Sequence, residues 1–144
     1  MITRLLTAQE IPLTFDGGKA FLEEAGWKAF NPGAFQRYWI AVLGEGVGEI
    51  NAVLDNGKVV AALGCAFIED PFTGGQTALE MFWWVHPDHR NSRIGLDLWR
   101  TFEKRAKDKG CKQIAMVHLA SLNLQHIFER RGYKLVEQTF RKEI

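Results

Sequence analysis

The spacing of apolar residues predicts two helices in the first third of the chain. From residue 16 to Gly26, apolar side chains recur at helical spacing before a glycine, which ends many helices. They are Ala20, Phe21, Leu22 and Ala25. Asn31 and Pro32 then supply a helix N-cap followed by proline at the first helical position. We expect this second helix to run to the glycines that begin at residue 44.

The next two apolar stretches predict strands. Residues 49–70 contain two apolar runs separated by Asp55, Asn56 and Gly57, residues that tolerate the positive φ angles of a tight turn. This pattern predicts an antiparallel hairpin. Residues 76–86 form a longer and more aromatic run, which predicts a central strand.

A third helix is predicted from Ser92 or Arg93 to Lys109, because apolar residues recur there every four positions between charged ones. These apolar residues are Ile94, Leu98, Phe102 and Ala106. Gly110 ends the helix, and residues 112–119 follow at once as a second buried strand. Strand, helix and strand with short joints predict a parallel pair with a right-handed crossover.

The end of the chain predicts a short helix at residues 121–132, again ended by a glycine, and a last strand at residues 133–144. Together the elements predict an α/β fold in which helices flank a mixed sheet. The 144 residues, 47% of them hydrophobic, suit one domain with its own core. We therefore expect a single domain over residues 1–144.

Charge and composition narrow the classes of partner. Lysine and arginine total 18 against 17 acidic residues, so a net charge of +1 gives no general attraction to nucleic acid or to a membrane surface. No stretch resembles a signal peptide or a membrane span, so a soluble, cytoplasmic protein is expected. Cys65 and Cys111 lack a zinc spacing and are expected as buried thiols. His86 and His89 lack a third ligand nearby, so no metal site is expected.

The junction between the aromatic strand and the third helix predicts an anion site. A helix start leaves backbone N–H groups unpaired, and the helix dipole adds partial positive charge there. Two arginines add mobile charge, an asparagine and a serine are short polar caps, and a glycine permits close approach. These residues are Arg90, Asn91, Ser92, Arg93, Ile94 and Gly95. A diphosphate would suit this set, although a capped helix with ordinary surface arginines gives the same pattern.

This junction resembles the acyl-CoA binding motif of the GNAT superfamily of N-acyltransferases. The motif has Arg or Gln, two residues, Gly, one residue, then Gly or Ala; here Arg90 holds the first position and Gly95 the last. The V-H-P at residues 85–87 and the R-R-G-Y at residues 130–133 are also similar to the family, as is the order of elements after residue 15. The resemblance implies the GNAT fold, with an acyl-CoA, most simply acetyl-CoA, as co-substrate.

The resemblance also implies which residues meet the co-substrate. They are Trp84, Val85, Arg90, Asn91, Ser92, Arg93, Ile94, Gly95, Asn123 and Phe128. Two of these positions differ from the family pattern. Arg93 stands where glycine is usual, and Phe128 stands where many members have a tyrosine that protonates the departing thiolate.

Two residues are candidates for catalysis. In strand register Glu80 shares one face with Phe82, Trp84 and His86, and desolvation among apolar neighbours would raise its pKa. It resembles the strand glutamate that serves as base in some family members; a carboxylate that faces solvent or pairs with a cation is the alternative. His118 ends the next strand, where the resemblance implies that two strands part to admit the cofactor, and a structural histidine is equally consistent.

The leading hypothesis is an N-acetyltransferase in which a primary amine attacks the acyl-CoA thioester directly, because no serine or cysteine is placed as a nucleophile. The acceptor would be a small-molecule or peptide amine. The alternative is a catalytically silent GNAT-like module that binds CoA or a protein partner, which Arg93 and Phe128 favour. A homodimer is compatible with either hypothesis, whereas nucleic-acid and membrane partners are not expected.

Overall fold

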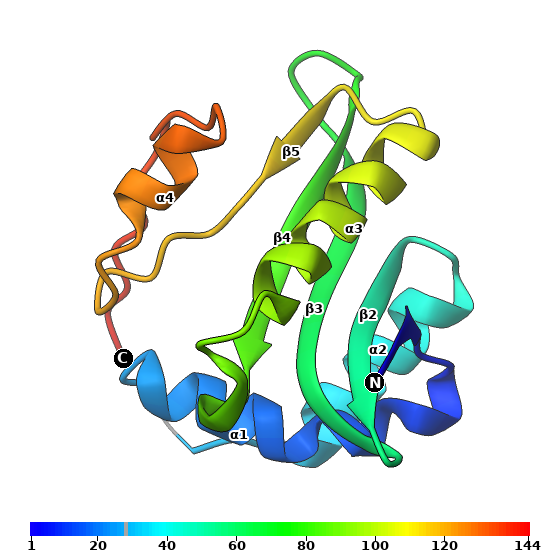
Figure 1. The fold of residues 1–144 in the computed structure, drawn as a ribbon. Helices are drawn as coiled ribbons and strands as arrows, with labels where there is room; N and C mark the ends of the chain where they lie inside the picture. Colours follow the sequence, from blue (N-terminus) through cyan, green and yellow to red (C-terminus); the bar gives the residue numbers. More distant parts are fainter. Residues whose placement is uncertain (28) are drawn as a thin grey trace.

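The computed structural model describes residues 1–27 and 29–144 and has a mixed five-stranded sheet at its centre (Figure 1). The strand order is β1-β2-β3-β4-β5, and every pair is antiparallel except β4 with β5, which is parallel. The strands are β1 Ile2–Leu5, β2 Gly48–Asp55, β3 Lys58–Glu69, β4 Gln76–Val85 and β5 Gln113–Ala115. The predicted α/β mixed sheet is thus confirmed.

Helices cover both faces of this sheet. On one face α3 (Ile94–Asp108) buries its apolar stripe against β3, with Trp99 and Phe102 fully enclosed. On the other face α2 (Pro32–Gly44) and the 3₁₀ helix η1 (Ala8–Thr14) pack on β2, β3 and β4. Ala61 and Ala62 are neighbours on β3 and belong to different clusters, since successive strand residues face opposite sides.

Local signals in the sequence set several element ends as expected. Helix α1 spans Phe15–Glu24, and the Asn31 side chain caps α2 by accepting a hydrogen bond from the Ala34 N–H at 3.0 Å. The turn between β2 and β3 has φ of 49° at Asn56 and 80° at Gly57. Positive φ at both central residues is the geometry of the predicted hairpin turn.

The C-terminal quarter differs from the sequence expectation. The predicted strand at residues 112–119 shortens to the three residues of β5, which are not fully buried, and Cys111 just before it is only partly buried. Helix α4 covers Gln125–Arg130, and residues 133–144 form no strand. Val136 and Phe140 remain 85% and 92% exposed. The last predicted strand was therefore wrong, because no sheet edge takes it up.

The sequence expectation also missed the first elements, β1 and η1. Strand β1 pairs with β2 along the edge of the sheet, from Ile2 opposite Leu54 to Leu5 opposite Asn51. Within the part of the chain that the structure describes, no helix is long and apolar enough to cross a membrane.

Candidate active site

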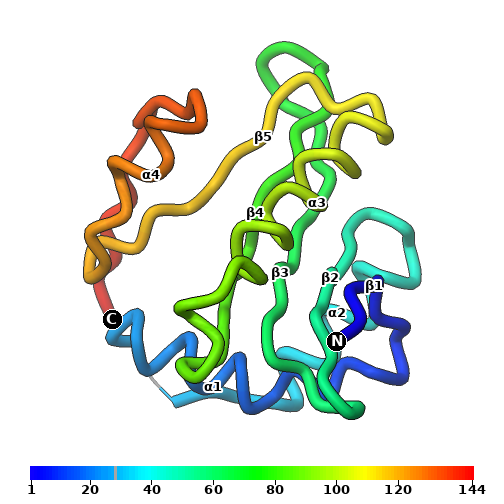
Figure 2. The backbone as a smooth tube through the Cα atoms, in the orientation of Figure 1, coloured from blue at the N-terminus to red at the C-terminus, as the bar shows by residue number. Residues whose placement is uncertain are grey.

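Strands β4 and β5 form a fork. Their parallel pairing runs from Thr77 with Gln113 to Leu79 with Ala115 and stops there. Beyond this point the two segments separate, and the β5 segment continues away toward α4 (Figures 1 and 2). Glu80 is the first β4 residue past the last pair, so its backbone lies at the base of the fork.

The Glu80 carboxyl group is buried without a charged partner among the described residues. The residue is 4% exposed. Burial raises its pKa to about 8, and a hydrogen bond from the backbone of Val117, across the fork, offsets part of that rise. The desolvated environment expected for Glu80 is therefore present. At neutral pH this carboxyl group is therefore mostly protonated and partly ionised.

A β-bulge corrects the expected orientation of Glu80. The register between β3 and β4 shifts so that Glu80 pairs with Cys65 but Phe82 pairs with Gly64. Because Cys65 and Gly64 are consecutive, their partners lie on opposite faces of the sheet. Glu80 therefore faces the α3 side. The expectation that it shares a face with Phe82, Trp84 and His86 was wrong.

His118 lies on the other arm of the fork, and its ring contacts the backbone of the residues that follow it in the chain. The residue falls three positions after β5. Its Nε2 lies 2.7 Å from the Leu122 carbonyl oxygen and 3.3 Å from the Leu124 backbone nitrogen. A hydrogen bond to the Leu122 carbonyl requires Nε2–H to donate, whereas one from the Leu124 N–H requires Nε2 to accept, so each tautomer makes one of the two bonds. The ring also packs edge-on against Phe128. These contacts fit a structural histidine in the turn before α4, and a catalytic part for His118 stays a prediction.

The start of α3 has the free donors that the sequence predicted. Arg93 is the N-cap with φ of −87°, and the first intrahelical bond runs from Asp97 N–H to the Arg93 carbonyl. The N–H groups of Gly95 and Leu96 precede that bond and point out of the helix end. Asn91, Ser92 and Arg93 are exposed, and the Ser92 hydroxyl lies 3.4 Å from the Ile94 backbone nitrogen. The three exposed side chains beside the helix start could meet an anionic ligand, whereas Gly95 itself is buried and Leu96 is partly buried.

Gly95 has a packing role that the motif alone did not reveal. A Cβ built at Gly95 would lie 3.0 Å from Val85 Cγ2 and 3.6 Å from the Trp83 ring. The missing side chain therefore allows α3 to approach β4 closely. Val85 and Gly95 are held together at the point where the strand ends and the helix begins.

Arg90 does not point freely into solvent. Its Nε donates to the Val85 carbonyl at 2.9 Å, and its Nη2 donates to Glu24 at the end of α1. This fixes the guanidinium at the end of β4. Glu24 was not predicted from the sequence, and no local signal could have revealed it because 66 residues separate it from Arg90.

The terminal helix places Phe128 in a core. Phe128 is buried, and its ring centroid lies 5.4 Å from that of Trp99 and 6.4 Å from that of Tyr133. Tyr133 OH, the hydroxyl beside this ring, donates to Glu103 at 2.9 Å. Asn123 is exposed two residues before α4. The predicted cofactor contacts Asn123 and Phe128 thus differ in accessibility.

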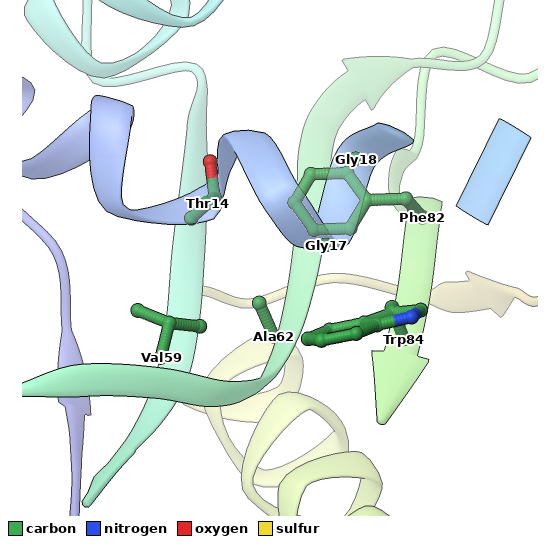
Figure 3. A pocket seen from close by; sticks show the side chains of 7 residues that line it. All are labelled: Thr14, Gly17, Gly18, Val59, Ala62, Phe82 and Trp84. Carbon is green, nitrogen blue, oxygen red and sulfur yellow. The ribbon is translucent and has the colours of Figure 1, made fainter. Parts of the chain in front are cut away.

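A small apolar pocket lies on the other face of the sheet, beneath α1 (Figure 3). Its lining residues are Thr14, Gly17, Gly18, Val59, Ala62, Phe82 and Trp84. A Cβ at Gly17 would lie 2.8 Å from the Trp84 ring, so glycine permits this contact between helix and strand. Trp84, a predicted cofactor contact, therefore packs on the α1 side, opposite α3.

Comparison with known proteins identifies the family. The acetyltransferase (GNAT) family model matches residues 17–133, and the chain belongs to this family. No curated protein matches the chain.

Solved structures share the fold. A GCN5-related N-acetyltransferase from Ralstonia eutropha has 20% identity and a TM-score of 0.82. The match covers 99% of this chain and 97% of the Ralstonia eutropha chain. A predicted acetyltransferase from Clostridium acetobutylicum, solved with acetyl-CoA, has 17% identity and a TM-score of 0.84, with coverages of 99% and 95%. A ribosomal-protein-alanine N-acetyltransferase from Brucella melitensis has 14% identity and a TM-score of 0.74, with full coverage of both chains, 100% and 100%.

Proposed function

We propose that this chain is an acyl-CoA-dependent N-acyltransferase, most simply an acetyltransferase, that acts on a primary amine of a small molecule or peptide. The family and the fold support acyl transfer in general. The acetyl-CoA present with the Clostridium acetobutylicum structure supports the choice of acyl donor.

The observation that carries the proposal is the position of Glu80 at the base of the β4–β5 fork. An amine must lose a proton to complete its attack on an acyl carbon, so the reaction needs a proton acceptor near its site. With a pKa of about 8, Glu80 is partly ionised near neutral pH and is a stronger base than an ordinary carboxylate. In this proposal a Glu80 carboxylate oxygen takes the amine proton and later releases it to solvent.

The residues at the α3 start fit the anionic part of acyl-CoA. The backbone N–H groups of Gly95 and Leu96, with the exposed Arg93 side chain, would hold a diphosphate. When bound, acyl-CoA supplies the activated acyl carbon. Gly95 keeps this helix start against Val85 at the end of β4, on the strand that also carries Glu80.

A specific observation favours the second candidate, a silent module that binds CoA or a protein partner. Phe128 occupies the position of the usual acid, and its ring is enclosed by Trp99, His118 and Tyr133. A phenyl ring cannot donate a proton to a departing thiolate. In the enzyme hypothesis the departing thiolate takes its proton from another residue or from water, or leaves without a general acid.

Turnover separates the two candidates. The protein is incubated with acetyl-CoA and a broad panel of primary amines, and free thiol is followed with time. The enzyme hypothesis predicts amine-dependent thiol release that Glu80→Gln slows about 10²- to 10⁴-fold. Saturable CoA binding without turnover of any amine would favour the silent module, and no CoA binding at millimolar concentration would exclude both CoA-dependent functions.

A further inference from the structure

Glu24 connects the two arms of the fork. It is the last residue of α1, and its carboxylate accepts a hydrogen bond from Arg90, in the loop after β4. Its backbone carbonyl accepts one from the Ser121 hydroxyl at 3.1 Å, in the segment between β5 and α4. One residue therefore contacts both segments that separate beyond the last β4–β5 pair.

The contact with Arg90 bears on anion binding. A guanidinium has five N–H donors, and Arg90 uses Nε for the Val85 carbonyl and Nη2 for Glu24. The remaining donors could contact a phosphate, but the Glu24 carboxylate cancels the positive charge of Arg90. It would also repel an approaching anion. Glu24 and a phosphate thus compete for the same cation.

The Arg90–Glu24 pair is suited to exchange. The two side chains are 44% and 33% exposed. Ion pairs this exposed contribute little to stability because water and salt screen them. Arg90 stays anchored through Val85 when the pair breaks, so its guanidinium remains at the end of β4.

The geometry points to Glu24 as a positioning residue that ties the open end of the fork together and that acyl-CoA displaces from Arg90 when it binds. This inference rests on the proposed function. It gives the end of α1 a part in co-substrate affinity that the binding motif itself does not contain.

The test compares Glu24→Gln with Glu23→Gln, a matched control that removes the same charge one residue earlier in α1, at an exposed position. Calorimetry with CoA should show about two- to five-fold tighter binding for Glu24→Gln than for the parent, the range that loss of a screened surface pair allows. The control should bind like the parent. Tighter binding should be absent when Glu24→Gln is combined with Arg90→Gln, because the competition requires Arg90.

Hydrogen exchange without CoA gives a second readout. The backbone N–H groups of Ala25, Gly26 and Trp27 bond to carbonyls of the last turn of α1. They should exchange about two- to five-fold faster in Glu24→Gln than in Glu23→Gln if the tie is lost.

The outcomes separate this inference from the proposed function. If hydrogen exchange is unchanged in Glu24→Gln, Glu24 does not hold the two arms of the fork together, whether or not the variant binds CoA more tightly. Unchanged or weaker CoA binding by Glu24→Gln would overturn the competition. Faster exchange with no CoA binding by parent or variant would keep the tie, but would overturn both the competition and the proposed function.

Discussion

Glu49 and Glu80 are two buried carboxyl groups that flank the same residue, Cys65, from either side of β3. They are 9% and 4% exposed. Glu49 accepts hydrogen bonds from the Arg105 guanidinium on α3 and lies 3.6 Å from Lys109 Nζ. Among the residues that the structure describes, no cation pairs with Glu80, and burial raises its pKa to about 8.

The difference shows that burial alone does not decide what a carboxyl group does. Next to Arg105, Glu49 joins α3 to the sheet as an ion pair. Glu80 lies at the fork, where β5 leaves β4, and faces a backbone N–H instead of a cation. The first arrangement stabilises the fold, and the second gives a site that can take up or release a proton near neutral pH.

The largest expected effect is the loss of catalytic rate when Glu80, and not Glu49, is substituted. Glu80→Gln keeps the shape of the side chain but removes the proposed base, so kcat for the proposed amine acetylation should fall about 10²- to 10⁴-fold. Glu49→Gln, the matched change on the other side of Cys65, should keep kcat within about three-fold, below the range for loss of a general base. Steady-state thiol release checks both variants, and an equal loss in the two would remove the distinction.

The next effect is on stability as a function of pH. The folded pKa of Glu80, about 8, lies above its ordinary value of 4.5, so between these values the folded protein holds more protons than the unfolded chain. The stabilisation that comes from the protonated Glu80 is fully present below the unfolded pKa of 4.5 and is lost as the pH rises through the folded pKa of about 8. Relative to Glu80→Gln, the parent should lose about 1.4 kcal/mol per pH unit within this window.

Urea unfolding of the parent and Glu80→Gln at several pH values between about 5.5 and 7.5 measures this slope. The same slope for both proteins would mean that Glu80 ionises at its ordinary pKa, and the contrast with Glu49 would fail.

A smaller effect is expected from breaking the Glu49 pair. Glu49→Gln leaves the Arg105 guanidinium without its carboxylate partner, although Arg105 is partly exposed to water. The free energy of unfolding should decrease by about 1 to 3 kcal/mol. Urea denaturation near neutral pH measures it. A stability equal to that of the parent would show that Glu49 does not join α3 to the sheet energetically.

The smallest effect concerns Lys109, the second cation near Glu49. Its side chain is 43% exposed, and its Nζ lies 5.2 Å from the centroid of the Phe67 ring. Lys109→Gln should cost about 1 kcal/mol or less, and most of that loss should disappear in high salt. A salt-independent loss as large as that of Glu49→Gln would assign the ion pair to Lys109 instead of Arg105.

Local chemistry made much of the fold predictable from the sequence. The Asn31 cap, the Asn56-Gly57 turn and the apolar stripe of α3 act within a few residues of chain, and each appears as expected. Strand β1 was missed because all four of its residues are exposed, so no alternation of apolar and polar residues marks it. The predicted last strand contains apolar residues, among them Leu135, Val136 and Phe140, but residues 133–144 form no strand and pair with no sheet edge.

Parts of the candidate site were also predictable, because they depend on residues that are close together in the sequence. Apolar neighbours along β4 indicated that Glu80 is desolvated, but a one-residue bulge set which face it occupies, and bulges have no reliable sequence signal. The free N–H groups before Asp97 followed from the helix start itself. The bond between Arg90 and Glu24 depends on how α1 and β4 meet in the folded protein, which no local pattern contains.

The pH dependence of kcat/KM for acetyl-CoA turnover tests the central claim most directly. It is measured with an acceptor amine that is uncharged across the whole range, so that only groups on the enzyme titrate. The account predicts that the rate rises with a midpoint near the Glu80 pKa of about 8, and that Glu80→Gln lacks this rise. An identical pH profile and rate in the parent and in Glu80→Gln would contradict Glu80 as the base.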